Sequence, residues 1–253
     1  MPRFSANLGF LWTETSLSDG IRAAAAAGFH AVECHFPYAE PEAEVIQALA
    51  DTGLSMLCVN TVRGDKGQNG LAAVPASQDE ARQAIDQALS TAEAIDAAHI
   101  HTMAGIASGQ AAEDCFIGNL IYGAQAAAAL NKTILIEPLN PYDAPDYFLS
   151  DIHQARAIID AANQPNIKLM FDMYHMQILH GNLTRLLETH LDIIGHIQFA
   201  SVPDRGAPDR GEVNFAHLFE VIDRCGWTQP LGAEYKPATS HVEDSLGWLQ
   251  PYI

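Results

Sequence analysis

Positive charge is scarce in this sequence. Its 253 residues include 13 lysines and arginines against 31 aspartates and glutamates, which gives a formal net charge of −18 at pH 7. A surface this acidic repels phosphate backbones, so we expect no nucleic-acid partner. It also offers no basic amphipathic face to a membrane. The simplest role of the acidity is to keep the protein in solution.

Cysteine pairs, leader sequences, long apolar runs and several catalytic motifs are also missing. The four cysteines lie far apart without a CxxC pair, which argues against a zinc knuckle and a dense disulfide scaffold. The N-terminal MPRFSANLGF does not resemble a secretory signal, and no apolar run approaches the roughly 20 residues that span a bilayer. No nucleophile elbow or P-loop supports acyl or phosphoryl transfer. We therefore expect a cytoplasmic protein with no membrane partner.

The sequence does contain a regular alternation of apolar strands and amphipathic helices. Strands that alternate with helices pair in parallel, and eight such units in roughly 250 residues are the size of a (β/α)8 TIM barrel. An open doubly wound sheet is disfavoured, because no GxGxxG follows the first strand. We see no linker and predict an α/β barrel that forms a single domain over residues 1–253. The strands are expected to begin near Phe4, Ala31, Leu54, His99, Thr133, Lys168, Ile193 and Leu231.

Helix boundaries can be predicted from local signals. Ser77–Glu80 has the pattern of a capping box that opens a helix running through Ala98. Ser150 and Asn214 each precede an apolar stripe with helical spacing, as N-terminal residues do. Gly53 stands where a glycine typically ends a helix before a strand begins.

One long loop follows the third predicted strand. It runs from Asn60 to Ala76 (NTVRGDKGQNGLAAVPA) and contains three glycines. Long ordered loops after barrel strands usually cover the active site. We therefore expect residues 60–76 to form a lid, with Asn60 among the residues that contact the substrate.

Four predicted strands end in an oxygen-bearing side chain. These side chains are Glu137, Asp172, Gln198 and Glu234, in the segments ILIEP, LMFDM, GHIQF and LGAEY, with spacings of 35, 26 and 36 residues. Any one of them alone is equally well explained as a helix N-cap or a polar turn. Together they end neighbouring barrel strands, so they should meet at the carboxyl end of the barrel. Three carboxylates and one amide predict a site for one divalent metal ion, Mg²⁺ or Mn²⁺, with Co²⁺ also accepted.

Other polar residues stand close to these strand ends. His175 follows Asp172 by three residues, and His101 ends the fourth predicted strand. Arg205 and Lys236 are two of the few cations, and both closely follow ligand strands. Cations beside carboxylates favour an anionic small-molecule substrate. A weaker signal comes from the ends of the first two strands, where Asn7, Glu33 and His35 would line the same mouth.

These segments make a family resemblance visible. The chain resembles the hydroxypyruvate isomerase family of xylose-isomerase-like barrels in MPRFSANL, AVECHFPY, NTVRGD, HTMAG, ILIEPLN, FDMYHMQ, GHIQFA, RGEVNF and AEYKP. The resemblance implies one barrel with one divalent metal held by Glu137, Asp172, Gln198 and Glu234. It implies further that Glu137 and Glu234 are the catalytic pair. His175, Arg205 and Lys236 match positions near the family's substrate.

The resemblance leaves the substrate open. FDMYHMQ and IEPLN are similar to hydroxypyruvate isomerases, whereas HTMAG and VPDR are more similar to 2-oxo-tetronate isomerases. The stretch after Gly64-Asp65 is shorter than in either group, which leaves the lid contacts open as well. We expect an aldose–ketose type isomerase that moves a proton through an enediolate on a small sugar acid. Whether it forms a homo-oligomer is left open.

Three other functions are alternatives to a sugar-acid isomerase. A ketose 3-epimerase would use the same two glutamates on a free sugar, although such relatives usually place histidine where Gln198 stands. A non-catalytic, metal-containing sugar-binding protein would have no need for both Glu137 and Glu234. An abasic-site endonuclease would require a basic DNA-binding face and a histidine-rich cluster of three metals, which the charge of −18 argues against.

Overall fold

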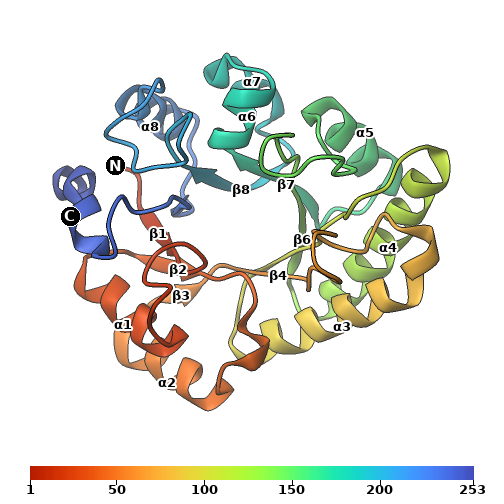
Figure 1. The fold of residues 1–253 in the computed structure, drawn as a ribbon, viewed down its shortest axis with the longest axis horizontal. Helices are drawn as coiled ribbons and strands as arrows, with labels where there is room; N and C mark the ends of the chain where they lie inside the picture. Colours follow the sequence, from red (N-terminus) through yellow and green to blue (C-terminus); the bar gives the residue numbers. More distant parts are fainter. The chain divides into compact units, whose positions relative to one another are not determined.

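The structure is a computed structural model that describes all residues 1–253 as two compact units (Figure 1). The first unit comprises Met1–Leu57, Asp172–Asp192 and His196–Ile253, and the second comprises Cys58–Phe171 and Ile193–Gly195. In both units strands alternate with helices, and the paired strands are parallel. The α/β class predicted from the sequence is therefore observed. That residues 1–253 form a single domain stays a prediction.

The first unit contains strands β1 (Phe4–Asn7), β2 (Ala31–Glu33), β3 (Ser55–Met56) and β9 (Leu231–Ala233), together with the last four residues of β8 (Ile194–Phe199). Their order is β3-β2-β1-β9-β8. Its helices are α1 (Leu17–Ala26), α2 (Glu42–Thr52), α6 (Met173–Leu179), α7 (Leu183–His190) and α8 (Phe215–Arg224), and its 3-10 turns are η1 (Pro37–Ala39), η3 (Val242–Ser245) and η4 (Gly247–Tyr252).

Strand register decides which side chains meet at the carboxyl end of this sheet. Asn7 pairs with Glu33 across β1 and β2, and Gln198 pairs with Gly232 across β8 and β9. Because the strands are parallel, their carboxyl ends lie at the same edge. Polar residues that end these strands are therefore brought together there.

An aromatic cluster packs behind the strands of the first unit. The ring of Phe4 on β1 makes edge-on contacts with Phe199, Phe219, Trp248 and Tyr252, with ring centroids 5.0–5.7 Å apart. Such contacts add roughly 0.5–1.5 kcal/mol each to the burial of the rings. The cluster joins β1, β8, α8 and the C-terminal η4, and so supports the strands from which the site residues project.

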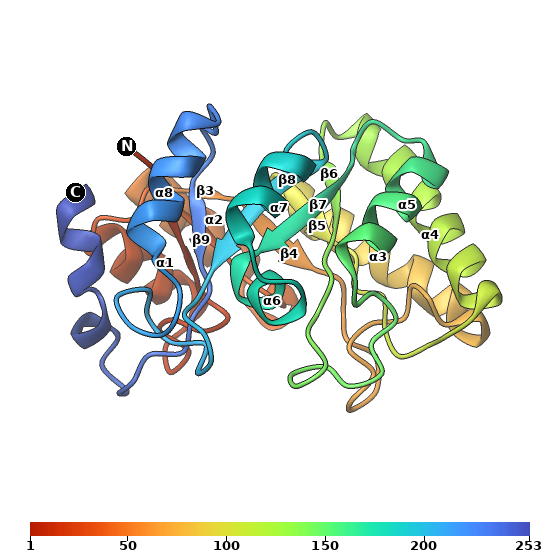
Figure 2. The same ribbon diagram turned by 90° about the horizontal axis from the view of Figure 1, so that it is seen from above.

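The second unit contains β4 (Cys58–Asn60), β5 (His99–His101), β6 (Thr133–Ile136) and most of β7 (Ile167–Asp172), in the order β4-β5-β6-β7. Its helices are α3 (Gln78–Ala94), α4 (Gln110–Ala129) and α5 (Ile152–Ala162), with η2 (Pro75–Ser77) before α3. The three helices lie along one face of these strands (Figures 1 and 2). The apolar face that the strands turn toward the helices is thereby covered.

Some predicted boundaries are wrong. The strand expected from Leu54 is two strands, because Ser55–Met56 pairs with β2 whereas Cys58–Asn60 pairs with β5. Ser77 makes no capping hydrogen bond, since η2 leaves its backbone at φ −117°, ψ 28° rather than extended, and α3 ends at Ala94 instead of Ala98.

Other helix signals are confirmed or displaced by one residue. The side chain of Asp151, not Ser150, caps α5 by accepting hydrogen bonds from the backbone of His153 and Gln154. Asn214 caps α8 by accepting from the His217 N–H, as predicted. Gly53 ends α2 in the left-handed conformation, with φ 69°, as predicted.

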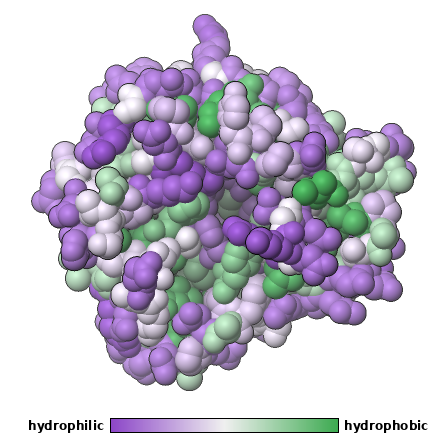
Figure 3. Space-filling model, in the orientation of Figure 1, coloured by the Kyte–Doolittle hydropathy of each residue, from purple (hydrophilic) through white to green (hydrophobic).

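Large apolar side chains are seldom exposed. The exceptions are Met1, Ile46, Ile106, Tyr142 and Ile253. The face drawn in Figure 3 is mostly hydrophilic, which agrees with the acidic composition. None of the helices has the length and apolar character needed to cross a bilayer.

Candidate active site

In the first unit, the strand ends place buried polar side chains around one arginine. Asp172, Gln198 and Glu234 are all almost completely buried; Asp172 ends β7, Gln198 is the last residue but one of β8, and Glu234 directly follows β9. Gly232 makes room between them: a Cβ atom at this position would lie 2.5 Å from Glu33 Oε1 and 2.7 Å from Gln198 Cγ. The absent side chain lets the polar groups of β2 and β8 approach each other.

Arg205 is the cation of this cluster. Its guanidinium contacts the Glu234 carboxylate through a short ion pair, and its Nη2 lies 3.4 Å from Asp172 Oδ2. The rings of Phe10 and Tyr174 contact the same guanidinium, with centroids 4.8 and 4.9 Å away. A weakly hydrated, planar guanidinium suits such a partly buried position against aromatic rings better than an ammonium group would.

The two oxygens of Asp172 face different partners. Oδ1 accepts a hydrogen bond from the Tyr174 N–H at 2.9 Å and so caps α6. Oδ2 faces Arg205 and lies 3.6 Å from His175 Nε2. Burial raises the pKa of Asp172 to about 8, the nearby Glu234 adds to the rise, and Arg205 opposes it. Asp172 is therefore a helix cap and a site-facing carboxyl group at once.

Glu234 has the opposite electrostatic character. Burial alone would raise its pKa, but Arg205 and His35 together hold the pKa below its usual range. His35 Nε2 donates to Oε1 at 3.0 Å, and Asn7 Nδ2 donates to the same oxygen at 2.9 Å. Glu234 is thus the ionised carboxylate of the pair.

Glu33 forms a second buried cluster beside the first. Its Oε2 accepts from His196 Nε2 at 2.5 Å, and its Oε1 accepts from the amides of Gln198 and Asn7, both at 3.0 Å. In the sequence the signal for Glu33 and Asn7 is weak, and no local pattern singles out His196. Only its position two residues before Gln198, on the same face of one strand, indicates it.

The second unit holds the remaining predicted residues. Glu137 directly follows β6 and is buried, with Oε2 3.7 Å from His101 Nδ1. Burial and the charge of Glu137 raise the pKa of Tyr147, whose hydroxyl accepts a hydrogen bond from the Ala104 N–H. Asn60 is half-buried and pairs in register with His101 across β4 and β5. His101 and Glu137 thus form a buried acid–imidazole pair.

Most of the predicted lid is tied to its own unit. Gly70 bridges to Ala104, and Ala73 N–H donates to the Ala104 carbonyl at 2.7 Å. Asn119 Nδ2 on α4 donates to the Ala72 carbonyl at 2.9 Å. Residues 63–67 are exposed, and the Arg63 carbonyl accepts a hydrogen bond from the Gly70 N–H at 2.8 Å. That residues 60–76 cover the substrate stays a prediction.

Lys236 differs from the other predicted site residues. Its backbone N–H donates to the Arg205 carbonyl at 2.7 Å, but its side chain is exposed and forms no ion pair. A contact between Lys236 and the substrate stays a prediction.

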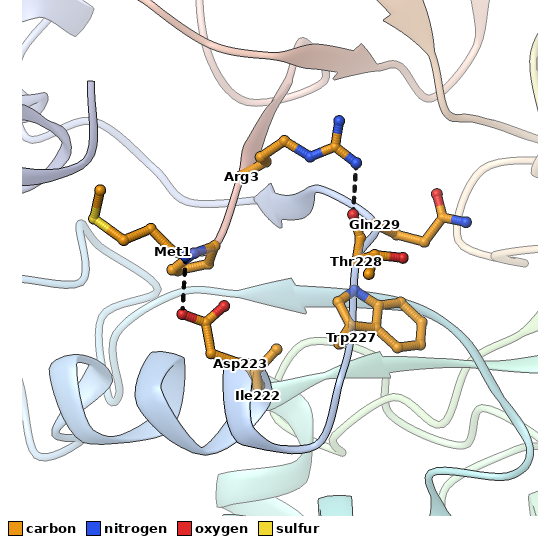
Figure 4. A pocket seen from close by; sticks show the side chains of 8 residues that line it. Met1, Arg3, Ile222, Asp223, Trp227, Thr228 and Gln229 are labelled. Carbon is orange, nitrogen blue, oxygen red and sulfur yellow. Dashed lines mark hydrogen bonds and ion pairs between the residues drawn. The ribbon is translucent and has the colours of Figure 1, made fainter.

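A cavity at the opposite end of the strands of the first unit contains none of these residues. It measures about 380 Å³ and is bordered by the Met1 amino group, 3.3 Å from Asp223, and by Arg3, which donates to the Thr228 carbonyl at 2.6 Å (Figure 4). Arg3 precedes β1, whereas Asn7 ends it. In barrels, residues at this amino-end face serve stability rather than catalysis.

The donors of the first unit fit a hard divalent cation. Asp172 and Glu234 offer carboxylate oxygens, and Gln198 Oε1 is buried with no hydrogen-bond partner. A buried acceptor without a donor is costly unless something positive contacts it. All-oxygen sets of this kind suit Mg²⁺ or Mn²⁺.

Comparison with known proteins places the chain in a family. The model of the xylose isomerase-like TIM barrel family matches residues 21–252. The chain therefore belongs to the xylose isomerase-like TIM barrel family, and the predicted barrel class is confirmed.

The relatives also identify the class of enzyme. The chain is 41% identical to the 2-oxo-tetronate isomerase of Cupriavidus necator, over all of this chain and 99% of that protein. It is 36% identical to the hydroxypyruvate isomerase of Escherichia coli over the full length of both. A crystal structure described as an AP endonuclease, family 2, from Brucella melitensis is 38% identical, with a TM-score of 0.95 over 100% of this chain and 99% of that one. The predicted resemblance to hydroxypyruvate isomerases is confirmed, and the protein is an isomerase.

Proposed function

We propose that this isomerase is metal-dependent and interconverts hydroxypyruvate and tartronate semialdehyde, or a closely related 2-oxo-tetronate. The observation that carries the proposal is the buried Asp172–Arg205–Glu234 group beside the unpartnered amide oxygen of Gln198. The names of the two isomerase relatives support the choice of substrate class.

Glu137, Asp172, Gln198 and Glu234 are the residues proposed to hold one divalent ion. The oxygens of Asp172, Gln198 and Glu234 lie at neighbouring strand ends of the first unit, while the participation of Glu137 rests on the sequence prediction. When bound, the cation would supply positive charge that favours negative charge developing on substrate oxygens.

Glu234 and Glu137 are proposed to move the proton. The first step removes the proton from the carbon next to the carbonyl group and gives an enediolate; the second returns a proton to the adjacent carbon. Glu234 is proposed as the proton acceptor because its carboxylate is ionised; the contacts with Arg205 and His35 that keep it ionised also lower its basicity. His101, 3.7 Å from Glu137, would help to hold the charge of the second carboxylate.

Arg205 is proposed to orient the anionic substrate. Its guanidinium has a fork of donors that matches a carboxylate group. The rings of Phe10 and Tyr174 both contact the guanidinium, which limits the orientations it can adopt. His175 and Asn60 remain proposed substrate contacts.

The decisive experiment follows isomerisation by NMR. Metal-loaded protein would be offered hydroxypyruvate, a 2-oxo-tetronate and a free ketose in deuterated water, and deuterium uptake at the exchanging carbon would be recorded. Turnover of the acids with uptake at the adjacent carbon is the expected result. Faster turnover of the ketose would favour a 3-epimerase. Binding without turnover of any of the three would favour a sugar-binding protein.

A DNA-cleaving role has little physical support, although the Brucella protein carries an endonuclease description. A net charge of −18 opposes the approach of a phosphate backbone. In the first unit the candidate donors are mainly carboxylates with one arginine between them, which suits a small substrate better than a polyanion.

A further inference from the structure

Glu33 is hydrogen-bonded to the candidate metal donor Gln198 but is not itself a candidate donor. It ends β2, is 1% exposed, and has both carboxylate oxygens occupied by N–H groups. His196 binds one oxygen, and the side-chain amides of Gln198 and Asn7 share the other. Nothing in the proposed reaction requires this carboxylate to touch the substrate.

The chemistry of a carboxylate decides which way the Gln198 amide faces. A carboxylate accepts hydrogen bonds but cannot donate them, so only the NH₂ end of the amide can point at Glu33. The amide oxygen must then point the other way, and Oε1 is the buried atom that has no partner. Without Glu33, the NH₂ and oxygen ends of the amide could exchange places at little cost.

The Asn7 amide links Glu33 to Glu234 and restricts the orientation of the Glu234 carboxylate in the same way. Its Nδ2 donates to both Glu33 Oε1 and Glu234 Oε1, while its Oδ1 accepts from the Gly9 N–H at 2.9 Å. Both the NH₂ group and the oxygen of the Asn7 side chain are therefore hydrogen-bonded. Because it uses Oε1 of Glu234, the Asn7 amide fixes the rotation of that carboxylate as well.

We propose that Glu33 is a positioning residue that turns the oxygen of Gln198 toward the metal site and, through Asn7, fixes the carboxylate of Glu234. The proposal rests on the proposed function, since it concerns how the same site takes up a divalent ion. Groups that orient metal ligands typically change metal affinity about 10- to 100-fold when they are removed.

An exchange of the two side-chain types provides the test. Glu33→Gln keeps size and shape but offers an amide that can both donate and accept, so the Gln198 amide loses its fixed orientation. Gln198→Glu alone places two buried carboxylates together. In the double variant, which combines Glu33→Gln with Gln198→Glu, an amide at position 33 again faces a carboxylate at position 198. The two side-chain types have exchanged places, and the net charge is that of the wild type.

The main readout is the Mn²⁺ dissociation constant, measured by calorimetry and electron paramagnetic resonance. We expect at least about tenfold weaker binding in each single variant, and recovery to within a few-fold of wild type in the double variant. Ser5→Ala on β1 is the matched control, because Ser5 is buried but its hydroxyl makes no hydrogen bond to any of these groups, and it should bind Mn²⁺ normally. Wild-type affinity in folded Glu33→Gln would overturn the proposal.

A second readout does not depend on metal. The side-chain NH₂ resonance of Gln198, assigned by its disappearance in Gln198→Glu, should be shifted and protected from solvent exchange in wild type, and both properties should be lost in Glu33→Gln. Unchanged resonances would overturn the positioning role. If wild type binds no Mn²⁺ yet the resonance behaves as expected, the metal-dependent function fails while the orienting contact stands.

Discussion

Arg205 forms an ion pair with Glu234 at the carboxyl end of β9, with the rings of Phe10 and Tyr174 against its guanidinium. The same guanidinium reaches Asp172, so one cation stands between two buried acids. Charge balance at the strand ends thus depends on a residue from the loop after β8. A substrate carboxylate would have to compete with Glu234 and Asp172 for Arg205. Alternatively, Arg205 would bind it once a metal ion compensates the charge of these two acids.

Replacement of Arg205 by alanine should damage catalysis on acids more than on neutral sugars. We expect a loss of roughly 2–4 kcal/mol in kcat/KM for the sugar acid, the scale of a lost buried charge pair. Lys236→Ala is the matched comparison, because the Lys236 side chain is exposed and unpaired; its loss should be smaller. The measurement is kcat/KM for an acid and a matched ketose in each variant. Equal losses on both substrates would mean that Arg205 only supports the fold.

Glu234→Gln and Glu137→Gln should each lower kcat about a hundredfold or more, the usual contribution of a general acid–base group. Both changes keep the shape of the side chain and remove the proton acceptor. Metal content must be measured by mass spectrometry alongside the rates, because each variant also removes a candidate ligand charge. A variant that keeps near-normal turnover with metal bound would show that its residue carries no proton.

Removal of divalent metal should abolish turnover and lower the melting temperature. An ion that binds only the folded state adds roughly 2.7 kcal/mol to the free energy of unfolding at a 100-fold excess over its dissociation constant. Dialysis against a chelator followed by addition of Mg²⁺, Mn²⁺ or Co²⁺, with calorimetry and rate assays at each stage, measures both effects. Full activity in rigorously metal-free protein would refute the metal dependence.

Much of the fold could be read from the sequence because strands and their ends are local features. The strands beginning at Phe4, Ala31, His99, Thr133 and Leu231 start where periodicity placed them. The capping box at Ser77 failed because the preceding 3-10 turn, not the side-chain pattern, sets the backbone there.

The site was harder to predict where it depends on contacts between distant strands. The bond between Glu33 and His196 joins residues 163 positions apart, and it exists only because of the strand register. No local pattern identifies such a pair. Asp172 shows a further limit. A helix cap and a site-facing group are alternatives in the sequence, whereas in the structure its two oxygens separate the roles: one caps α6, and the other faces Arg205.

Gly232→Ala should destabilise the protein and weaken metal binding together. The new methyl group would meet Glu33 Oε1 at 2.5 Å and Gln198 Cγ at 2.7 Å, and Glu33 cannot move without giving up its N–H partners. Overpacking of this kind costs typically 1–3 kcal/mol. Gly118→Ala within α4 is the control: nothing lies within 4 Å of the added atom, and alanine favours a helix by up to about 1 kcal/mol. Chemical denaturation of both variants should therefore give shifts of opposite sign.

Cys34 should resist alkylation in the folded protein at pH 8. Burial raises the pKa of the Cys34 thiol far above its ordinary value of 9.0, and the neighbouring charges of Glu33 and Glu40 raise it further. Because the thiolate is the reactive form, iodoacetamide should modify the half-buried Cys225 first, and Cys34 only after unfolding. Peptide mass spectrometry after timed exposure measures the order.

The raised pKa of Cys34 should also make stability depend on pH. Above about pH 9 the unfolded chain loses a proton that the folded chain keeps, so Cys34 lowers the free energy of unfolding as the pH rises. Cys34→Ser should remove this dependence, and early labelling of Cys34 in native protein would contradict the buried position that the structure gives it.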